Sequence, residues 1–350
     1  MTSSPRPGTL EWLTDQRPDE AVLLTSVGAL TRSAWEARAE AVAEGLAADG
    51  VAAGDLLSAA GRIGVDWFVT SWAAAKLGAG LAGLPPGPVL ELPGARFVEL
   101  DHGDLRFPAP GADPAAPEGG AERPAPRRLS GTAPPPDAVT FSRLGRAVRR
   151  RFTAATVPAI GTTLADLVAR LRAVPGTTLV VCGPVSDPIL TFLASVVLVG
   201  GGRVASAPTP AATLALAAPH DAGLAALAPA DLAALAELDA PARETLDLTS
   251  VGALVTGGAP VAAADRAAAD DLFGPETIID VYATADTGVV AVRSGDEPHH
   301  VLLEGVSVRL GAAGLLEVRS PLAAAPGWVA TGDRAGLVGD GGMRLPAATA

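Results

Sequence analysis

The sequence predicts an α/β protein of two or three subdomains with a small all-β portion from about residue 289 onward. Three observations lead to this fold class. Apolar segments typical of strands alternate with amphipathic segments along most of the chain. From about residue 289 this alternation gives way to short strands separated by turns. The chain has 350 residues, 49% of them hydrophobic and 18% charged, so it is long enough for more than one core and too apolar to be disordered.

The first subdomain is expected to span residues 1–107. AVLLTSVGAL predicts a strand, a turn and a second strand, and TRSAWEARAEAVAEGLAADG predicts a helix that Thr31 or Ser33 can cap. DLLSAAG is typical of a short strand, and VDWFVTSWAAAKLGAG of a second helix ending in glycine. This β-α-β-α order favours a parallel sheet covered by helices.

Three further segments complete the predicted organisation. Residues 108–136 are rich in Pro, Gly and Ala, so they cannot bury enough apolar surface to fold and are expected to form a flexible loop. Residues 137–288 resume the alternation: TTLVVCG reads as a buried strand, PILTFLASVVLVGG as a buried helix and AATLALAAPH as a helix. Residues 289–350 form the small β portion.

Composition excludes several classes of function. The formal net charge of -12 argues against a general nucleic-acid binder, which would show a basic surface. Cys182 is the only cysteine, so no internal disulfide and no zinc-binding cysteine cluster is expected. The polar start is not a signal peptide, and the longest apolar run is shorter than the ~20 residues of a membrane span. We therefore expect no membrane partner and a cytoplasmic location.

Three short stretches carry candidate chemistry. The first is LVTGGAPV, in which a predicted strand leads into paired glycines. The second is VYATADTGVV, which places Tyr282 and Asp286 at the end of a strand. The third is GWVATGDRAGLVGDGGMRL, which places Asp333 where a loop can face a cleft. Taken singly, each has an ordinary structural interpretation: a tight turn, a core tyrosine with a solvated aspartate, and a second turn. Their order and spacing together make a functional interpretation stronger.

Together these stretches resemble the adenylate-forming superfamily of acyl-CoA synthetases, peptide-synthetase adenylation domains and luciferases. The resemblance extends to WAAAKLGAGLAGLPP near the start and to VVCGPVSDPILTFLASVVLVGGGRV, which is similar to the family's acyl-pocket segment. It covers nearly the whole chain and implies the α/β fold of the family's large N-terminal domain, with two sheet-and-helix subdomains and a small, distorted β-barrel-like portion. The family's C-terminal domain would be absent.

The resemblance implies roles for individual residues. The adenine-binding stretch maps to Gly257, Gly258, Ala259 and Pro260. The family's Tyr-Gly-x-Thr-Glu motif maps to Tyr282, Ala283 and Asp286, and its Thr-Gly-Asp aspartate, which holds the ribose hydroxyls, to Asp333. Asp286 would be a weak Mg²⁺ ligand, because aspartate is one methylene shorter than the family's glutamate. The remaining implied sites are those of the acyl pocket, Asp187 and Ala283, although a surface loop is an alternative for Asp187.

An arginine-rich stretch, PDAVTFSRLGRAVRRRF, occupies the position of the family's phosphate loop. The loop maps to Thr140, Ser142, Arg143, Gly145 and Arg146. The family's Pro-Lys pair is deleted here, and large side chains stand at positions where the family has small residues. Two interpretations stay open. These arginines are either the exposed start of the next segment or a substitute anion cradle, since the planar guanidinium suits phosphate.

These departures lead to the functional prediction. Lys76 is the only lysine, and it does not map to a catalytic position of the family. We predict a degenerate, truncated AMP-binding protein, a pseudoenzyme that binds acyl groups or nucleotides (ATP or AMP, with Mg²⁺) beside an acyl-carrier protein or an acyl-activating enzyme of a polyketide-type pathway. The alternative is an ATP-dependent acyl-adenylating ligase, acting alone or with a partner that supplies the lysine. Oligomerisation and another acyl or nucleotide chemistry in the same cleft stay open.

Overall fold

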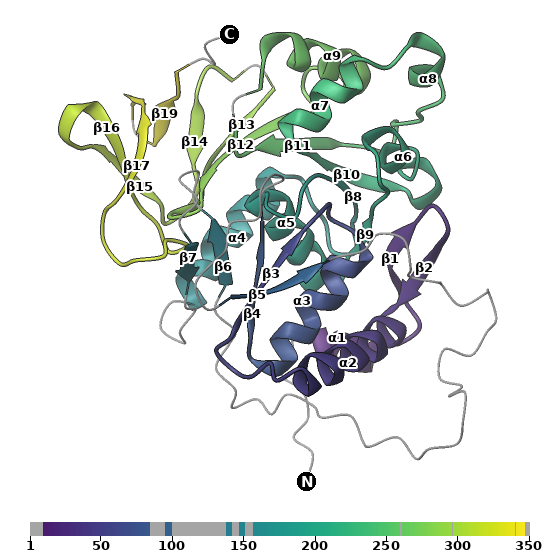
Figure 1. Cartoon of the computed structure of the whole chain (residues 1–350). Helices are drawn as coiled ribbons and strands as arrows, with labels where there is room; N and C mark the ends of the chain where they lie inside the picture. Colours follow the sequence, from purple (N-terminus) through teal and green to yellow (C-terminus); the bar gives the residue numbers. More distant parts are fainter. Residues whose placement is uncertain are drawn as a thin grey trace, which may run out of the picture.

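The computed structural model describes residues 10–84, 95–99, 138–141, 147–150, 157–259, 261–295, 297–339 and 341–346. Its main feature is an eleven-stranded mixed sheet (Figure 1). In spatial order its strands are β18 (Gly336–Val338), β19 (Gly342–Arg344), β14 (His300–Leu302), β13 (Gly288–Ser294), β12 (Ile278–Thr284), β11 (Ala253–Gly257), β10 (Ala222–Leu227), β8 (Thr178–Cys182), β9 (Arg203–Ala205), β1 (Ala21–Thr25) and β2 (Gly28–Thr31). The central strands from β12 to β1 run parallel, and antiparallel strands extend both edges.

Three smaller sheets accompany the large one. The parallel sheet consists of β4 (Gly80–Gly83), β3 (Leu56–Ala60) and β5 (Ala95–Glu99). The antiparallel sheet consists of β15 (Ser307–Leu310), β16 (Leu315–Arg319) and β17 (Val329–Arg334). A hairpin consists of β6 (Ala138–Phe141) and β7 (Ala147–Arg150).

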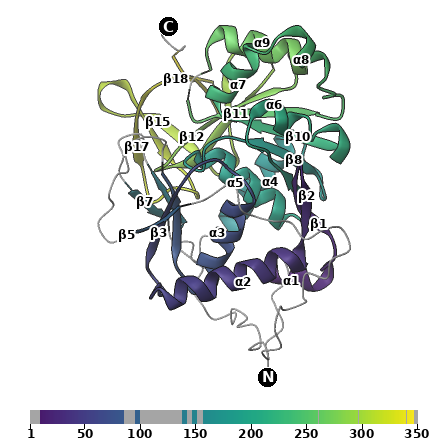
Figure 2. The same cartoon turned by 45° about the vertical axis from the view of Figure 1, so that its right-hand side comes forward.

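Helices pack on both faces of the large sheet (Figure 2). One core cluster includes side chains of α2 (Arg32–Ala48), α3 (Val65–Leu77), α4 (Val157–Arg170) and α5 (Pro188–Val199). The other includes side chains of α6 (Pro210–Leu214), α7 (Pro229–Ala236) and α9 (Ala263–Phe273). The remaining helical segments are α1 (Leu10–Gln16), α8 (Ala240–Glu244) and the short 3₁₀ turns Ala218–His220 and Ala312–Gly314.

Strand β8 shows why the sheet is covered on both faces. Leu179 and Val181 belong to the cluster with α4 and α5, whereas Val180 and Cys182 belong to the cluster with α6 and α7. Successive strand side chains point to opposite faces, so a strand that is apolar at every position needs cover on both sides. The continuous apolar run TLVVC therefore predicts the buried central strand that is observed.

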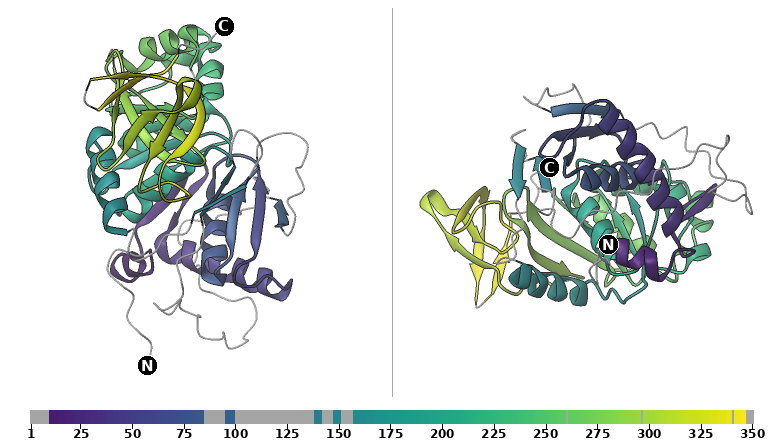
Figure 3. Two further views of the ribbon diagram at one scale, coloured as in Figure 1. Left: turned by 90° about the vertical axis from the view of Figure 1, so that its left-hand side faces the viewer. Right: turned by 90° about the horizontal axis from the view of Figure 1, so that it is seen from below.

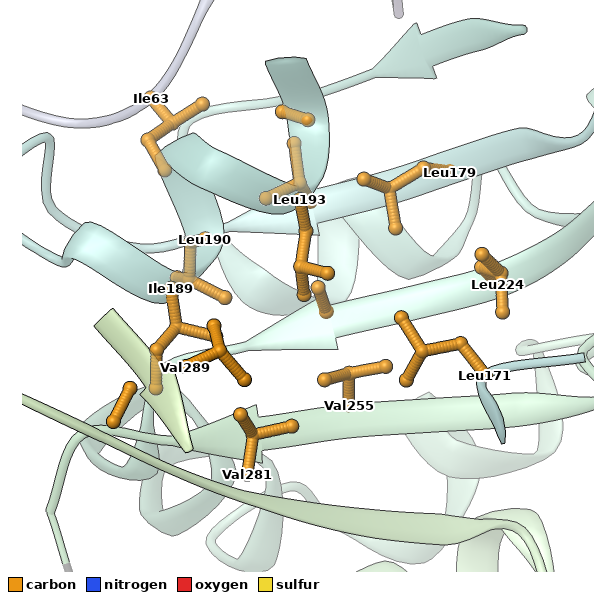
Figure 4. Close-up of a cluster of buried hydrophobic side chains, with 14 of the residues drawn as sticks. Ile63, Leu171, Leu179, Ile189, Leu190, Leu193, Leu224, Val255, Val281 and Val289 are labelled. Atoms are coloured by element: carbon orange, nitrogen blue, oxygen red, sulfur yellow. The ribbon is translucent and has the colours of Figure 1, made fainter. Parts of the chain in front are cut away.

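Helix α5 lies at the centre of the larger cluster. Ile189, Leu190 and Leu193 pack against Leu179 and Val255 of the sheet (Figure 4). Each such side chain contributes about 1.5–3 kcal/mol through burial, so this helix stabilises the fold strongly.

Two predicted elements can be compared directly with the structure. The Thr31 hydroxyl accepts a hydrogen bond from the Ala34 amide at 3.2 Å, which confirms it as a cap of α2. The single helix predicted from AATLALAAPH is wrong: α6 ends at Leu214, and a 3₁₀ turn containing Pro219 follows. Pro219 has no amide proton for a helical hydrogen bond, so a helix cannot continue regularly through residue 219; this does not account for the earlier end of α6 at Leu214.

The strands of the first and last predicted segments join the large sheet. β1 pairs with β9, and β13, β14, β18 and β19 extend the opposite edge. The sheet of β15 to β17 lies on the far side of the molecule from α2 and α3 (Figure 3). Within the described residues, no helix is long and apolar enough to cross a membrane.

Candidate functional site

The carboxyl end of β11 brings bare backbone to the site. A Cβ atom on Gly257 would lie 2.1 Å from the carbonyl oxygen of Val281, so only glycine fits between β11 and β12. Gly258 has a φ of 80°, a conformation that residues with a side chain rarely adopt. The paired glycines thus have separate roles, since Gly257 permits the strands to pack and Gly258 turns the chain.

Tyr282 and Asp333 meet although they are far apart in the sequence. Tyr282, in β12, is 6% exposed, and its hydroxyl donates a 2.7 Å hydrogen bond to Oδ2 of Asp333 in β17. The Asp333 amide in turn donates to the Thr331 hydroxyl, and that hydroxyl donates to the Leu316 carbonyl. The Thr-Gly-Asp segment is therefore anchored to β16 while its carboxylate contacts the tyrosine.

A pocket of about 700 Å³ opens at these residues. Of the residues expected from the sequence, Gly258, Ala259, Tyr282, Ala283 and Asp333 line it. Its size is within the range of about 300–1,000 Å³ that is usual for small-molecule sites. The structure thus brings parts of all three sequence motifs to one cavity.

The other expected residues have different positions. Gly257 is not part of the pocket lining, and neither are Asp187 and Asp286. Thr140 pairs with Val148 across the β6–β7 hairpin. The expected residues that lie outside the described part of the chain are Ser142, Arg143, Gly145, Arg146 and Pro260.

Asp187 caps α5. Its Oδ1 accepts hydrogen bonds from the amides of Ile189 (2.9 Å) and Leu190 (3.1 Å), a common role of aspartate before Pro at the first helical position. Burial raises the pKa of Asp187 to about 6, although the two amide hydrogen bonds oppose this shift. Its Oδ2 would lie 3.7 Å from a Cβ atom built on Gly258, so the carboxyl group is a close neighbour of the pocket wall.

Asp286 lies in the turn between β12 and β13. Its backbone carbonyl accepts a hydrogen bond from the Ala324 amide at 2.8 Å, which connects this turn to the segment before β17. Among the described residues, no group of three His, Cys, Asp or Glu side chains is arranged to hold a metal ion. A Mg²⁺ role for Asp286 stays a prediction.

The sequence reasoning missed a charged group in the pocket. Asp280 Oδ2 accepts a 2.8 Å hydrogen bond from Arg293 and lies 3.4 Å from Nε2 of His300, and all three residues line the pocket. Burial alone would raise the pKa of Asp280, but His300 and Arg293 outweigh it and bring the pKa below its ordinary value. Residues two apart in a strand share a face, so the position of Asp280 before Tyr282 was a usable signal.

A second polar group lies at the carboxyl end of β8. Arg62 donates to Asp231 Oδ1 at 2.6 Å and contacts the Cys182 sulfur at 2.8 Å. Burial raises the pKa of the Cys182 thiol despite the nearby guanidinium, so the thiol is held in its neutral form. This group does not line the pocket.

No family model and no curated protein sequence matches the chain. Among solved structures, amide bond synthetase McbA from Marinactinospora thermotolerans has a TM-score of 0.68 at 21% identity, over 96% of this chain and 78% of that protein. MatB from Rhodopseudomonas palustris gives 0.70 at 18% identity, over 97% and 78%.

A third structure contains a nucleotide. O-succinylbenzoate coenzyme A synthetase (MenE) from Bacillus subtilis, in complex with AMP, matches with a TM-score of 0.71 at 15% identity, over 97% of this chain and 78% of that one. These similarities confirm the predicted α/β fold, that of the large N-terminal domain of adenylate-forming enzymes. At these identities the likeness shows the fold.

Proposed function

We propose that this chain is an adenylate-forming-type protein that binds an adenine nucleotide or an acyl adenylate in the pocket, as an accessory rather than a catalytic subunit. The observation that carries this proposal is the Tyr282–Asp333 hydrogen bond at the wall of a pocket that Gly258 and Ala259 also line. Residues from three separated motifs form one cavity, which a chance match of short motifs would not explain.

The pocket chemistry suits a nucleoside. The backbone of Gly258 and Ala259 offers a surface against which a flat base can lie. The Tyr282 hydroxyl donates to Oδ2 of Asp333, which fixes the orientation of that carboxylate as an acceptor for hydroxyl groups of a sugar. AMP and ATP are therefore the ligands that we propose.

The residues available for charge stabilisation argue for the accessory role. Lys76, the only lysine of the chain, lies on α3 with its side chain 5% exposed, and it pairs with Glu36 and Glu40 of α2. It does not line the pocket, and α2 and α3 lie on the other side of the molecule from β17 (Figure 3). Loss of one preorganised donor typically lowers a rate ~10²–10³-fold, so the lack of a lysine in the described lining supports the accessory role, although four arginines line the pocket and can attract an anion.

An acyl-adenylating ligase is the second candidate. The pocket retains Tyr282 and Asp333 in contact, and the fold is that of enzymes with this activity. In this case a partner would supply the cationic group. An acyl-carrier protein or an acyl-activating enzyme, in the cytoplasm, is the partner class that either candidate implies.

Two measurements test the proposal. Calorimetric titration with AMP, ATP and an acyl-sulfamoyl adenosine should show saturable binding that Asp333→Ala weakens at least tenfold. Pyrophosphate exchange over a panel of carboxylic acids should show no turnover by the chain alone. Robust exchange would replace the accessory role by the ligase, and absence of binding by all three ligands would overturn both candidates.

A further inference from the structure

We propose that the pocket holds a phosphate monoester on an arginine rim formed by Arg266, Arg334 and Arg344. The ligand class is an adenine nucleotide with at least one terminal phosphate. Its anion would lie at this rim instead of at the predicted phosphate loop. The inference rests on the proposed function for the nucleoside part, which would lie against Tyr282 and Asp333.

The charge of the pocket is the first observation. Four arginines and two aspartates line it, in a chain whose formal net charge is -12. Arg293 is paired with Asp280 at 2.8 Å, and Arg266 lies 4.0 Å from Asp270, which is outside the lining. Among the lining groups this leaves Arg334 and Arg344 with the single carboxylate of Asp333. This local excess of positive charge favours an anionic ligand.

Two rim arginines line the pocket from the end of β17 and from β19. Arg344 of β19 pairs in register with Gly336 of β18, and Arg334 lies two residues before Gly336. Both arginines are exposed, and neither forms an ion pair with any other residue that the structure describes. A guanidinium presents a planar fork of donors that matches phosphate oxygens, so two of them at one edge suit a phosphate group.

The third arginine comes from a different element. Arg266 lies in the first turns of α9, and its Nη2 donates a 2.7 Å hydrogen bond to the Gly295 carbonyl, which limits its freedom. Val261, before this helix, and Ala263, its first residue, also line the pocket. The N-cap residue Ala262 has no polar side chain that could cap the helix, although Asp265 adds a negative charge to the first turn. The amide groups and the dipole at this end add to the attraction for an anion.

Two histidines line the same wall of the pocket. His300 is 4% exposed, pairs in register with Met343 beside Arg344, and lines the pocket together with His299. Nδ1 of His299 is buried without a hydrogen-bond partner among the described residues. Buried polar atoms in native proteins usually have a hydrogen-bond partner, so a polar atom of a ligand bound at this wall would provide one for His299 Nδ1.

Calorimetric titration of the full chain tests the rim. The ligands are adenosine, 5′-AMP, 3′-AMP, adenosine 3′,5′-bisphosphate and inorganic pyrophosphate. We expect at least one phosphorylated ligand to bind ~10-fold or more tightly than adenosine, because charge-assisted hydrogen bonds are about twice as strong as neutral ones. Arg334→Ala/Arg344→Ala should remove this advantage and leave adenosine binding unchanged.

A matched control separates the rim from overall charge. Arg309 lies in β15 and Arg319 in β16, and both contact the Trp328 ring outside the pocket. The control variant is Arg309→Ala/Arg319→Ala, which removes the same number of positive charges as the rim variant. This variant should still bind the phosphorylated ligand more tightly than adenosine, by the same factor as the wild type. If the alanine rim variant does not fold, the Gln substitutions at the same two positions retain the length of the side chains and repeat the test.

The outcomes distinguish the two proposals. If adenosine binds but its phosphates bind no tighter, the rim proposal fails and the nucleoside site stands. If pyrophosphate binds only when the rim is intact and no nucleoside binds, the anion site stands and the proposed function fails. Equal losses in the rim and control variants, or equal losses of adenosine and AMP in the rim variant, would also reject the rim.

Discussion

The hydroxyl of Tyr282 donates a hydrogen bond to Oδ2 of Asp333, and this contact joins β12 of the large sheet to β17 of the three-stranded sheet. Hydrogen bonds to charged groups contribute about 1.5–3 kcal/mol. Tyr282→Phe should therefore lower the free energy of unfolding by an amount in that range and weaken nucleotide binding. Urea denaturation and calorimetry measure the two effects. Asp271→Asn, at an exposed position of α9, is the control and should change neither.

Asp187 is expected to make stability depend on pH. Its folded-state pKa of about 6 exceeds the ordinary value of 3.8, so the folded protein holds this proton more tightly than the unfolded chain. The contribution to stability is therefore complete below pH 3.8 and is lost as the pH rises through 6. The full difference amounts to up to about 3 kcal/mol.

Asp187→Asn tests this dependence, because asparagine also caps helices well and cannot ionise. The variant should match the wild type near pH 4 and exceed its stability at pH 7. Thermal denaturation at several pH values gives the comparison. Asp239→Asn changes the exposed cap of α8 and controls for the substitution itself. Equal stability of wild type and Asp187→Asn at pH 7 would contradict the assignment.

Lys76 is expected to be structural. Its ammonium group pairs with Glu36 and Glu40 and lies 5.5 Å from the centre of the Trp72 ring. Removing one partner of a buried ion pair typically costs 3–5 kcal/mol, because a charge is left unpaired. Lys76→Met should destabilise the fold by about this amount and leave the affinity for nucleotide unchanged. Adding Glu36→Gln should restore part of the stability, whereas a loss of binding without a loss of stability would point to a catalytic lysine.

Gly257 is expected to resist substitution. A Cβ atom there would meet the Val281 carbonyl oxygen at 2.1 Å, so Gly257→Ala should lower the free energy of unfolding by about 1–3 kcal/mol. Gly161, on α4, has no atom within 4 Å of an added Cβ. Gly161→Ala should stabilise the protein by about 0.5–1 kcal/mol, because glycine within a helix is unfavourable. Denaturation curves of the two variants should shift in opposite directions.

Local pattern predicted much of the fold. The run TLVVC, the Thr31 cap and the glycine-terminated helix α3 all depend on neighbouring residues, and each is found as expected. The helix predicted over residues 211–220 is wrong: α6 ends at Leu214, and Pro219 interrupts regular helical hydrogen bonding in the last part of that range. Which edge of the large sheet receives each later strand depends on contacts between distant segments, which periodicity does not encode.

The candidate site was predicted in part for the same reason. Tyr282 and Asp333 belong to motifs that are recognisable in the sequence, so their meeting could be expected. Asp280, Arg293 and His300 form their cluster through pairing across β12, β13 and β14. Asp187 could be recognised as a cap from the Asp-Pro pair, but its raised pKa results from burial that only the folded chain shows.

The pairing of β1 with β9 has a consequence for how the chain reaches its native state. Leu23 of β1 is paired in register with Val204 of β9. During synthesis β1 therefore emerges long before the strand with which it pairs. Contacts between such distant segments slow the search for the native topology and expose unpaired strand edges to aggregation during synthesis. The hairpin of β1 and β2 thus lacks its partner strand until β9 has been made, and chaperone dependence should concentrate on that interval.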